Sequence, residues 1–140
     1  MLLHPVVHLH VFNSRGELYL QKRPAWKDIQ PGRWDTAVGG HVDYGETVGE
    51  ALRREVREEV GVTDFEPQHV LTYLFESERE RELVYVYKTV YDGPVVPSGE
   101  LDGGRFWTLR EIAEGVGGGI FTPNFEGEIR RVAELPDVGR

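Results

Sequence analysis

The sequence predicts an α/β fold, an α/β/α sandwich built on a mixed β-sheet. Three observations support this class. Several short segments alternate between apolar and polar residues, as half-buried strands do. A central segment repeats an aliphatic residue every four positions, as an amphipathic helix does. Near the C-terminus, Thr122 and Pro123 provide an N-cap and a first-turn proline for another helix.

The N-terminal third contains two predicted strands and a loop. Residues 4–12 alternate and predict a strand, and the turn residues 13–16 lead to a second strand through Leu20. A loop over 23–32, punctuated by prolines, precedes a short extended piece near Trp34. A glycine pair then leads into the central helix.

The central helix is predicted from Thr47 to Val60. Thr47 is a suitable N-cap, and Glu50 stands at the spacing of a capping box. Gly61 follows where a left-handed C-cap is required. The predicted buried stripe consists of Val48, Leu52, Val56 and Val60.

The C-terminal half reads as a hairpin followed by short elements. The charged run 76–82 is typical of a hairpin tip, and a Gly/Pro-rich loop spans 92–104. The predicted elements are strands over 68–76, 83–91 and 105–108, a helical turn over 109–114, and a last helix ending near Pro136.

Composition limits the class of protein. We expect residues 1–140 to form one domain with a full core. The chain is 29% charged and 39% hydrophobic, and no apolar run reaches the length of a membrane span, so a cytoplasmic location is the default expectation. It has no cysteine, which excludes disulfides and thiol catalysis. A net charge of −8 argues against nucleic-acid binding, and an anionic substrate would need bound cations or a local basic cluster.

Residues 40–62 carry the most specific pattern in the chain. Seven residues stand at fixed spacings, and a chance match is on the order of 10⁻⁸ per start position: Gly40, Glu46, Arg54, Glu55, Glu58, Glu59 and Gly61. Three of the glutamates are spaced i, i+3 and i+4, so their carboxylates crowd one side of the helix. Like charges at this spacing destabilise a helix, and a bound cation would reverse that interaction. Oxygen ligands without sulfur fit Mg²⁺, with Mn²⁺ as a substitute. The alternative is a solvated acidic face.

This spacing resembles the Nudix box in every position. The resemblance implies the Nudix-type sandwich fold and metal-assisted hydrolysis of a nucleoside diphosphate derivative or another organic diphosphate. It implies Glu58 and Glu59 as the main metal ligands, Glu55 as a ligand or the general base, and a backbone carbonyl of Gly39 or Gly40 as a further ligand. Two other residues of the box, Glu46 and Arg54, are expected to pair and to hold the loop on the helix.

Residues 20–41 resemble the corresponding stretch of isopentenyl diphosphate isomerases, a branch on the same fold. In that branch an Arg and a Lys hold the substrate diphosphate, and Arg23 and Lys27 match them. The alternative is two ordinary surface charges. The isomerases need a cysteine before their Gly-His, whereas this chain has Gly39 there and keeps the box in its hydrolase form.

A carboxylate outside the helix completes the metal cluster of this family. Glu100 matches the hydrolase position and is our preferred candidate, while Glu80 and Glu82 match the pair used by the isomerases. His41 matches a metal-binding histidine of the isomerases. Three further histidines share a face of the first strand and are expected at the surface or on a pocket wall: His4, His8 and His10.

Two classes of function remain. The first is a Mg²⁺-dependent hydrolase of a small-molecule diphosphate, without a nucleic-acid or membrane partner. The second is a protein on the same fold that does not hydrolyse its ligand, either a ligand-binding regulator or an isomerase. The intact set of glutamates favours the hydrolase, and the missing cysteine argues against the isomerase. Homodimers are common in the family, and the sequence leaves this state open.

Overall fold

A computed structural model describes residues 2–24, 31–98 and 103–138. The strands are β1 (Leu3–Phe12), β2 (Leu18–Lys22), β3 (Trp34–Thr36), β4 (Val38–His41), β5 (Gln68–Glu76), β6 (Arg81–Val90) and β7 (Gly104–Trp107). The helices are α1 (Val48–Val60), α2 (Leu109–Gly115) and α3 (Pro123–Val132). None of the helices in these ranges is both long and apolar enough to cross a membrane.

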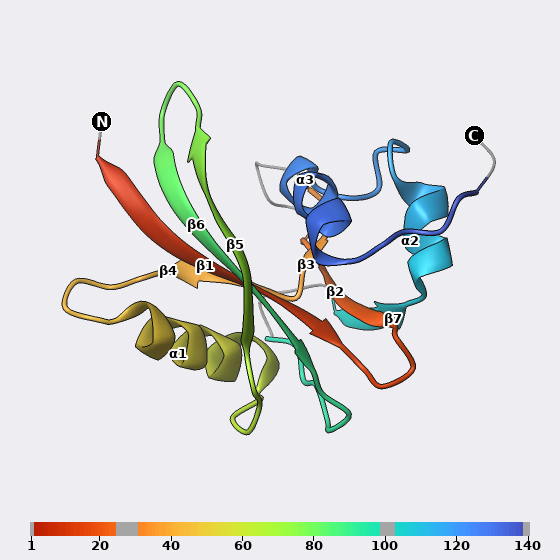
Figure 1. The fold of residues 1–140 in the computed structure, drawn as a ribbon, viewed down its shortest axis with the longest axis horizontal. Helices are drawn as coiled ribbons and strands as arrows, with labels where there is room; N and C mark the ends of the chain where they lie inside the picture. Colours follow the sequence, from red (N-terminus) through yellow and green to blue (C-terminus); the bar gives the residue numbers. More distant parts are fainter. Residues whose placement is uncertain (1, 25–30, 99–102, 139–140) are drawn as a thin grey trace.

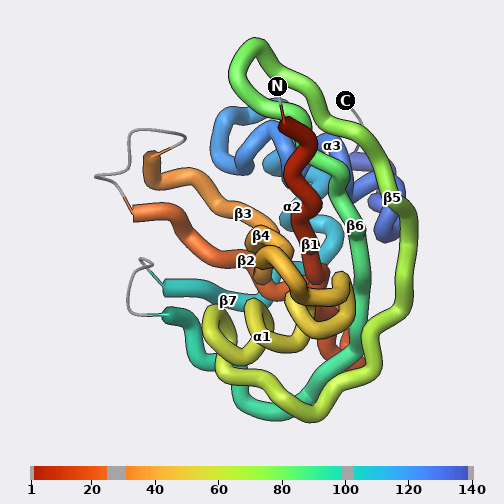
Figure 2. The backbone as a smooth tube through the Cα atoms, turned by 90° about the vertical axis from the view of Figure 1, so that its left-hand side faces the viewer, coloured from red at the N-terminus to blue at the C-terminus, as the bar shows by residue number. Residues whose placement is uncertain are grey.

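The strands form one mixed sheet around β1 (Figure 1). The main path has the order β3-β2-β1-β6-β5, while β4 pairs with β1 and β7 pairs with β2. The pairing of β1 with β6 is parallel, and the other named pairs are antiparallel. Figure 2 shows β1, β6 and β5 running side by side, with β5 at the edge.

Helices cover both faces of this sheet, which confirms the predicted α/β/α sandwich (Figure 1). On one face, Val7 and Leu9 of β1 pack in the same core cluster as Leu52 and Val56 of α1. On the other face, the side chains of β2 and β7 pack against α2 and α3 in a second cluster: Leu18, Leu20, Trp107, Ile112, Phe121, Phe125 and Ile129. A third cluster consists of Val6, Val84, Val86 and Val132. The alternation of β-strand side chains therefore supplies buried residues on both faces of the sheet.

Helix α1 begins and ends as its sequence predicts. The Thr47 side chain accepts a hydrogen bond from the Glu50 N–H, and the Glu50 side chain accepts one from the Thr47 N–H, which completes the capping box. Gly61 closes the helix at φ 69°, a conformation that costs glycine little. These caps fix where the acidic residues of α1 point.

Three elements differ from the sequence-based prediction. Residues 38–41 form a strand, β4, because β1 offers an open antiparallel edge to the glycine pair. The segment 109–115 is a capped helix of its own rather than a helical turn. Helix α3 ends at Val132 rather than near Pro136, because Ala133 is extended at φ −147°.

The two halves of the sheet separate beside β1. Strands β1 and β2 are in register only at Phe12 and Leu18. Beyond that pair, β4 takes the free edge of β1, and β3 takes the free edge of β2. The divergence leaves room between the two halves, and the candidate site lies there.

Candidate functional site

Two carboxylates of α1 meet beside this divergence. Glu55 and Glu59 are one helical turn apart, and Glu59 Oε1 accepts a hydrogen bond from Gln21 Nε2 at 3.3 Å. Glu59 Oε2 is buried and has no hydrogen-bond partner within the described part of the chain. Burial, and then the neighbouring Glu55 carboxylate, raise the pKa of Glu59 well above its usual range, although the Gln21 amide and the Gly39 backbone oppose the shift. The site therefore disfavours two negative charges on this pair when no cation is bound.

The glycine pair of β4 faces these carboxylates. A Cβ at Gly40 would overlap the Glu55 carboxyl group, so only glycine permits this approach. A Cβ at Gly39 would lie 3.3 Å from Cδ2 of His8 on the neighbouring strand. The structure thus brings the predicted Gly39, Gly40, Glu55 and Glu59 to one place.

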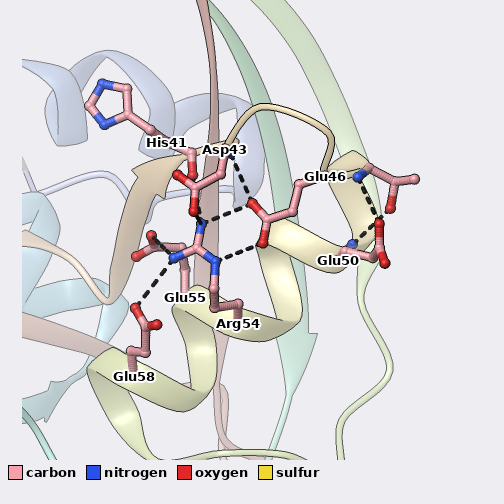
Figure 3. A network of polar contacts seen from close by, with 8 residues as sticks. His41, Asp43, Glu46, Glu50, Arg54, Glu55 and Glu58 are labelled. Atoms are coloured by element: carbon pink, nitrogen blue, oxygen red, sulfur yellow. Dashed lines mark hydrogen bonds and ion pairs between the residues drawn. The ribbon is translucent and has the colours of Figure 1, made fainter.

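Arg54 joins α1 to the loop that precedes it (Figure 3). Its Nε and Nη2 donate to the two oxygens of Glu46 at 2.7 and 3.0 Å, which confirms the predicted pair. Nη1 donates to Glu55 at 2.7 Å, and Nη2 also donates to the His41 carbonyl at 3.0 Å. The hydrogen bonds from Arg54, and then from the Asp43 backbone, lower the pKa of Glu46 to about 2. Arg54 therefore holds Glu55 in place as well as the loop.

A cavity of about 140 Å³ opens at this point. It is lined by His8, Gln21, Arg23, Asp35, Thr36, Gly39, Glu59 and Asn124. Arg23, one of the two predicted phosphate-binding residues, therefore lies on the cavity wall. Its Nη1 lies 3.8 Å from Asp35 Oδ2. The other predicted residue, Lys27, lies outside the described residues, as does Glu100.

A second hollow of about 530 Å³ shares Arg23, Asp35 and Asn124 with this cavity. Its wall includes Glu80 and Glu82 at the β5–β6 hairpin, the alternative outer carboxylates. Glu82 Oε2 lies 3.9 Å from Nε2 of His41. The hairpin therefore places these glutamates on the outer hollow rather than beside Glu59.

A buried polar cluster lies next to the cavity. Glu128 of α3 is 3% exposed and accepts three hydrogen bonds, from His8 Nδ1 at 2.6 Å, His10 Nε2 at 3.0 Å and the Tyr73 hydroxyl at 2.5 Å. Burial alone would raise the pKa of Glu128, but the bonds from His10 and His8 outweigh it and hold the pKa well below its usual range. Burial would likewise lower the pKa of His8, yet the bond to Glu128 leaves it raised.

This cluster corrects one prediction about the histidines. His8 lies on a pocket wall as expected, but His10 is fully buried because Glu128 supplies a partner for it. Sequence reasoning overlooked Glu128, although a signal existed: it lies in the apolar stripe of α3 with Phe125, Ile129 and Val132. A carboxylate in such a stripe needs buried donors.

The fit of a divalent metal can be judged from the donors present. Within residues 2–24, 31–98 and 103–138, no three His, Asp or Glu side chains converge as a metal site. Glu58 is about half exposed and accepts from Arg54 Nη1 at 3.3 Å, so it would have to leave Arg54 to join the other two. The neighbouring Glu55 and Glu59 carboxyl groups nevertheless fit a hard cation, because they are oxygen donors and Glu59 Oε2 finds no hydrogen-bond partner among the described residues.

The family model of the NUDIX domain matches residues 2–125, a range that includes the glycine pair, α1 and the cavity. The chain belongs to the NUDIX domain family. An uncharacterised Nudix hydrolase of Pseudomonas aeruginosa is 35% identical over 97 residues, which are 69% of this chain and 57% of that relative. The isopentenyl-diphosphate Δ-isomerase of Serratia proteamaculans is 29% identical over 118 residues, covering 81% and 64% of the two chains.

Solved structures show the same Nudix fold. The crystal structure of a MutT protein from Methanosarcina mazei Go1 superposes with a TM-score of 0.76 and 25% identity, over 92% of this chain and 91% of that one. This Nudix chain spans only part of its curated relatives, 57% of the Pseudomonas protein and 64% of the Serratia isomerase.

Proposed function

We propose that the chain is a Mg²⁺-dependent hydrolase that cleaves the diphosphate linkage of a nucleoside diphosphate derivative or another organic diphosphate, with Mn²⁺ as a substitute metal. The observation that carries the proposal is the contact of Glu55 with Glu59, which lines the cavity. Burial, and then the neighbouring Glu55 carboxyl group, raise the pKa of Glu59, and a bound divalent cation would oppose both effects by favouring the carboxylate form. Membership of the Nudix family supports the same reaction.

The proposed metal ligands are Glu55, Glu58 and Glu59, with a backbone carbonyl of Gly39 or Gly40 and the carboxylate of Glu100. When bound, the cation would neutralise phosphate oxygens and make the attacking water more acidic. Arg54 keeps Glu55 oriented, either as a ligand or as the general base for that water. Gly40 leaves the space that the Glu55 carboxylate needs.

Arg23 and Lys27 are the proposed phosphate-binding residues. Arg23 supports this role because it stands on the cavity wall together with Glu59. Its planar fork suits two phosphate oxygens, which an ammonium group cannot contact in the same way. Arg23→Ala should therefore weaken chemically different diphosphates by a similar factor, and a loss confined to one of them would contradict a phosphate contact.

The decisive experiment is a panel of nucleotide and isoprenoid diphosphates with Mg²⁺, in which released phosphate and the product are both identified. Glu59→Gln and Glu58→Gln should each lower the rate by at least about 10²-fold, the range for loss of electrostatic stabilisation or of a general base. The control is the exposed Glu66→Gln, which should keep the wild-type rate. A loss below about tenfold in both variants would overturn the metal assignment.

An isomerase-like reaction is the second candidate. The proximity of His41 and Glu82, two positions matched to the isomerases, favours it. Gly39, which offers no acid or base where the isomerases carry cysteine, argues against it. The same panel separates the two, because isomerisation releases no phosphate. If Glu100→Gln costs more than Glu82→Gln, the hydrolase arrangement is supported. The cytoplasmic location and the single domain over 1–140 stay predictions, and the oligomeric state stays open.

A further inference from the structure

His8 connects the buried carboxylate Glu128 to the cavity that contains Glu59. Its side chain is 16% exposed and lines the cavity, while the ring is anchored from behind through Nδ1. None of the proposed roles of Glu55, Glu58 and Glu59 uses this histidine. The structure therefore leaves an anchored imidazole on the wall of the site without a function.

The hydrogen bonds of Glu128 fix how His8 is presented. A carboxylate only accepts, so the three groups around Glu128 must each donate, and Nδ1 of His8 must carry a proton. The opposite edge of the ring then faces Gly39: Cδ2 and Nε2 lie 3.3 and 3.6 Å from the position that a Gly39 Cβ would occupy. Among the described residues, no hydrogen-bond partner is found for Nε2.

The size and lining of the cavity indicate what Nε2 would contact. At about 140 Å³ the cavity is well below the ~300 Å³ at which sites for organic ligands usually begin. It suits a compact polar group, and Arg23 on the same wall supplies a positive charge, although Asp35 Oδ2 lies 3.8 Å from its Nη1 and Glu59 also lines the cavity. The larger hollow outside it shares three lining residues and leaves space for an organic group.

We propose that His8 is a substrate-binding residue whose Nε2 hydrogen-bonds a phosphate oxygen of the diphosphate in this cavity, and that Glu128 is the residue that positions it. This inference rests on the proposed function, because it assumes a diphosphate ligand. Nε2 and the phosphate oxygen share one proton. The bond is made in the ground state, so it contributes to substrate affinity rather than to the chemical step.

Two substitutions of His8 separate its two nitrogens. In His8→Asn the amide nitrogen reaches the position of Nδ1 and keeps the bond to Glu128, but nothing replaces Nε2. In His8→Gln the amide nitrogen reaches the position of Nε2 instead. The probe is methylenediphosphonate, a diphosphate analogue that cannot be hydrolysed, titrated by calorimetry into wild type, both variants and the control His69→Gln, an exposed histidine of β5.

His8→Asn should weaken binding of the probe by about tenfold to a hundredfold, the loss expected for one hydrogen bond to a charged group. His8→Gln should retain part of the affinity, and the control should retain all of it. In steady-state hydrolysis, His8→Asn should raise KM and leave kcat nearly unchanged. Unchanged probe affinity in His8→Asn, or equal losses in the two variants, would overturn the contact.

The positioning role of Glu128 is tested by Glu128→Gln. Nitrogen-15 NMR of the ring should show the proton fixed on Nδ1 of His8 in wild type and redistributed between the two nitrogens in the variant. Glu128→Gln should weaken binding of the probe in the wild-type background. It should cause little further loss of binding in His8→Asn, because both substitutions act through one contact. Additive losses, or an unchanged ring signal, would refute positioning.

Failure of the inference can be distinguished from failure of the proposed function. If wild type hydrolyses a diphosphate while His8→Asn binds the probe normally, the function stands and the inference is wrong. If wild type hydrolyses nothing in the panel but binds the probe, and His8→Asn binds the probe more weakly, the phosphate contact stands and the proposed hydrolysis is wrong.

Discussion

Glu128→Gln should destabilise the protein strongly, because a neutral amide cannot accept all the hydrogen bonds that the carboxylate accepts. Oε2 receives two donors and Oε1 receives one. If the amide of Glu128→Gln places its oxygen at the Oε2 position, its NH₂ group takes the Oε1 position and faces the N–H of His10 Nε2, so two donors meet. Moving the His10 proton to Nδ1 does not help, because Nδ1 is buried and none of the described residues offers it an acceptor. At least one donor stays unsatisfied and the charge is lost, which costs about 2–4 kcal/mol of the free energy of unfolding.

Urea denaturation at about pH 6 measures this loss, with an unchanged m-value as the sign that the denatured state is the same. Glu114→Gln, which removes one carboxylate of an exposed ion pair with Arg110, should cost less than about 1 kcal/mol. A loss below about 1 kcal/mol for Glu128→Gln would refute the hydrogen-bond accounting.

The pH dependence of the same difference is a separate check. The folded pKa of Glu128 is depressed, so its contribution is present above the unfolded value of about 4.3 and disappears as the pH falls through the folded value. The folded pKa of His8 is raised, so its contribution is complete below about 6.5 and disappears as the pH rises through the folded value. The difference in the free energy of unfolding between wild type and Glu128→Gln should therefore become smaller at both low and high pH. A difference that grew in acid would contradict this sign.

Three further outcomes are expected. Gly40→Ala should lower the rate of hydrolysis by about tenfold or more, because the added methyl group displaces the Glu55 carboxylate. The control is Gly49→Ala, at an exposed helical site with open space, which should gain about 0.5–1 kcal/mol of stability and keep its activity. Equal activities of the two variants would show that Glu55 need not touch β4. Arg54→Lys should lower kcat/KM by about tenfold or more, because an ammonium cannot hold the loop and Glu55 together, and wild-type kinetics would exclude this role. Saturating Mn²⁺, at about 100 times its Kd, should add about 2.7 kcal/mol to the free energy of unfolding; Glu59→Gln should lose most of this gain in thermal melts, and an equal gain in both proteins would place the metal elsewhere.

The features that the sequence predicted well are those set by neighbours in the chain. The capping box of Thr47 and Glu50, and the left-handed Gly61, depend on residues within one turn, and the structure has them as predicted. The pair of Glu46 and Arg54 spans eight residues and was also predictable, because the motif fixes the spacing. Local chemistry was sufficient for each of these.

The features that the sequence did not reveal depend on contacts between distant segments. His8 and Glu128 are 120 residues apart, and nothing in the pattern of either strand or helix specifies that they meet. Strand β4 contains two glycines, which have low strand propensity, and it exists because β1 offers a pairing edge. The outward turn of Glu58 toward Arg54 likewise depends on where the preceding loop places its charges.

The single register pair between β1 and β2 has a consequence for substitutions far from the chemistry. Strands β1 and β2 diverge from the pair Phe12 and Leu18. One wall of the cavity is Gly39 on β4, which pairs with β1, and the opposite wall is Gln21 on β2. A small change in the angle between β1 and β2 at this pair becomes a larger displacement at the cavity, and tightly packed cores transmit such shifts. The shape of the pocket is therefore set in part by how two apolar side chains pack at the far end of the sheet.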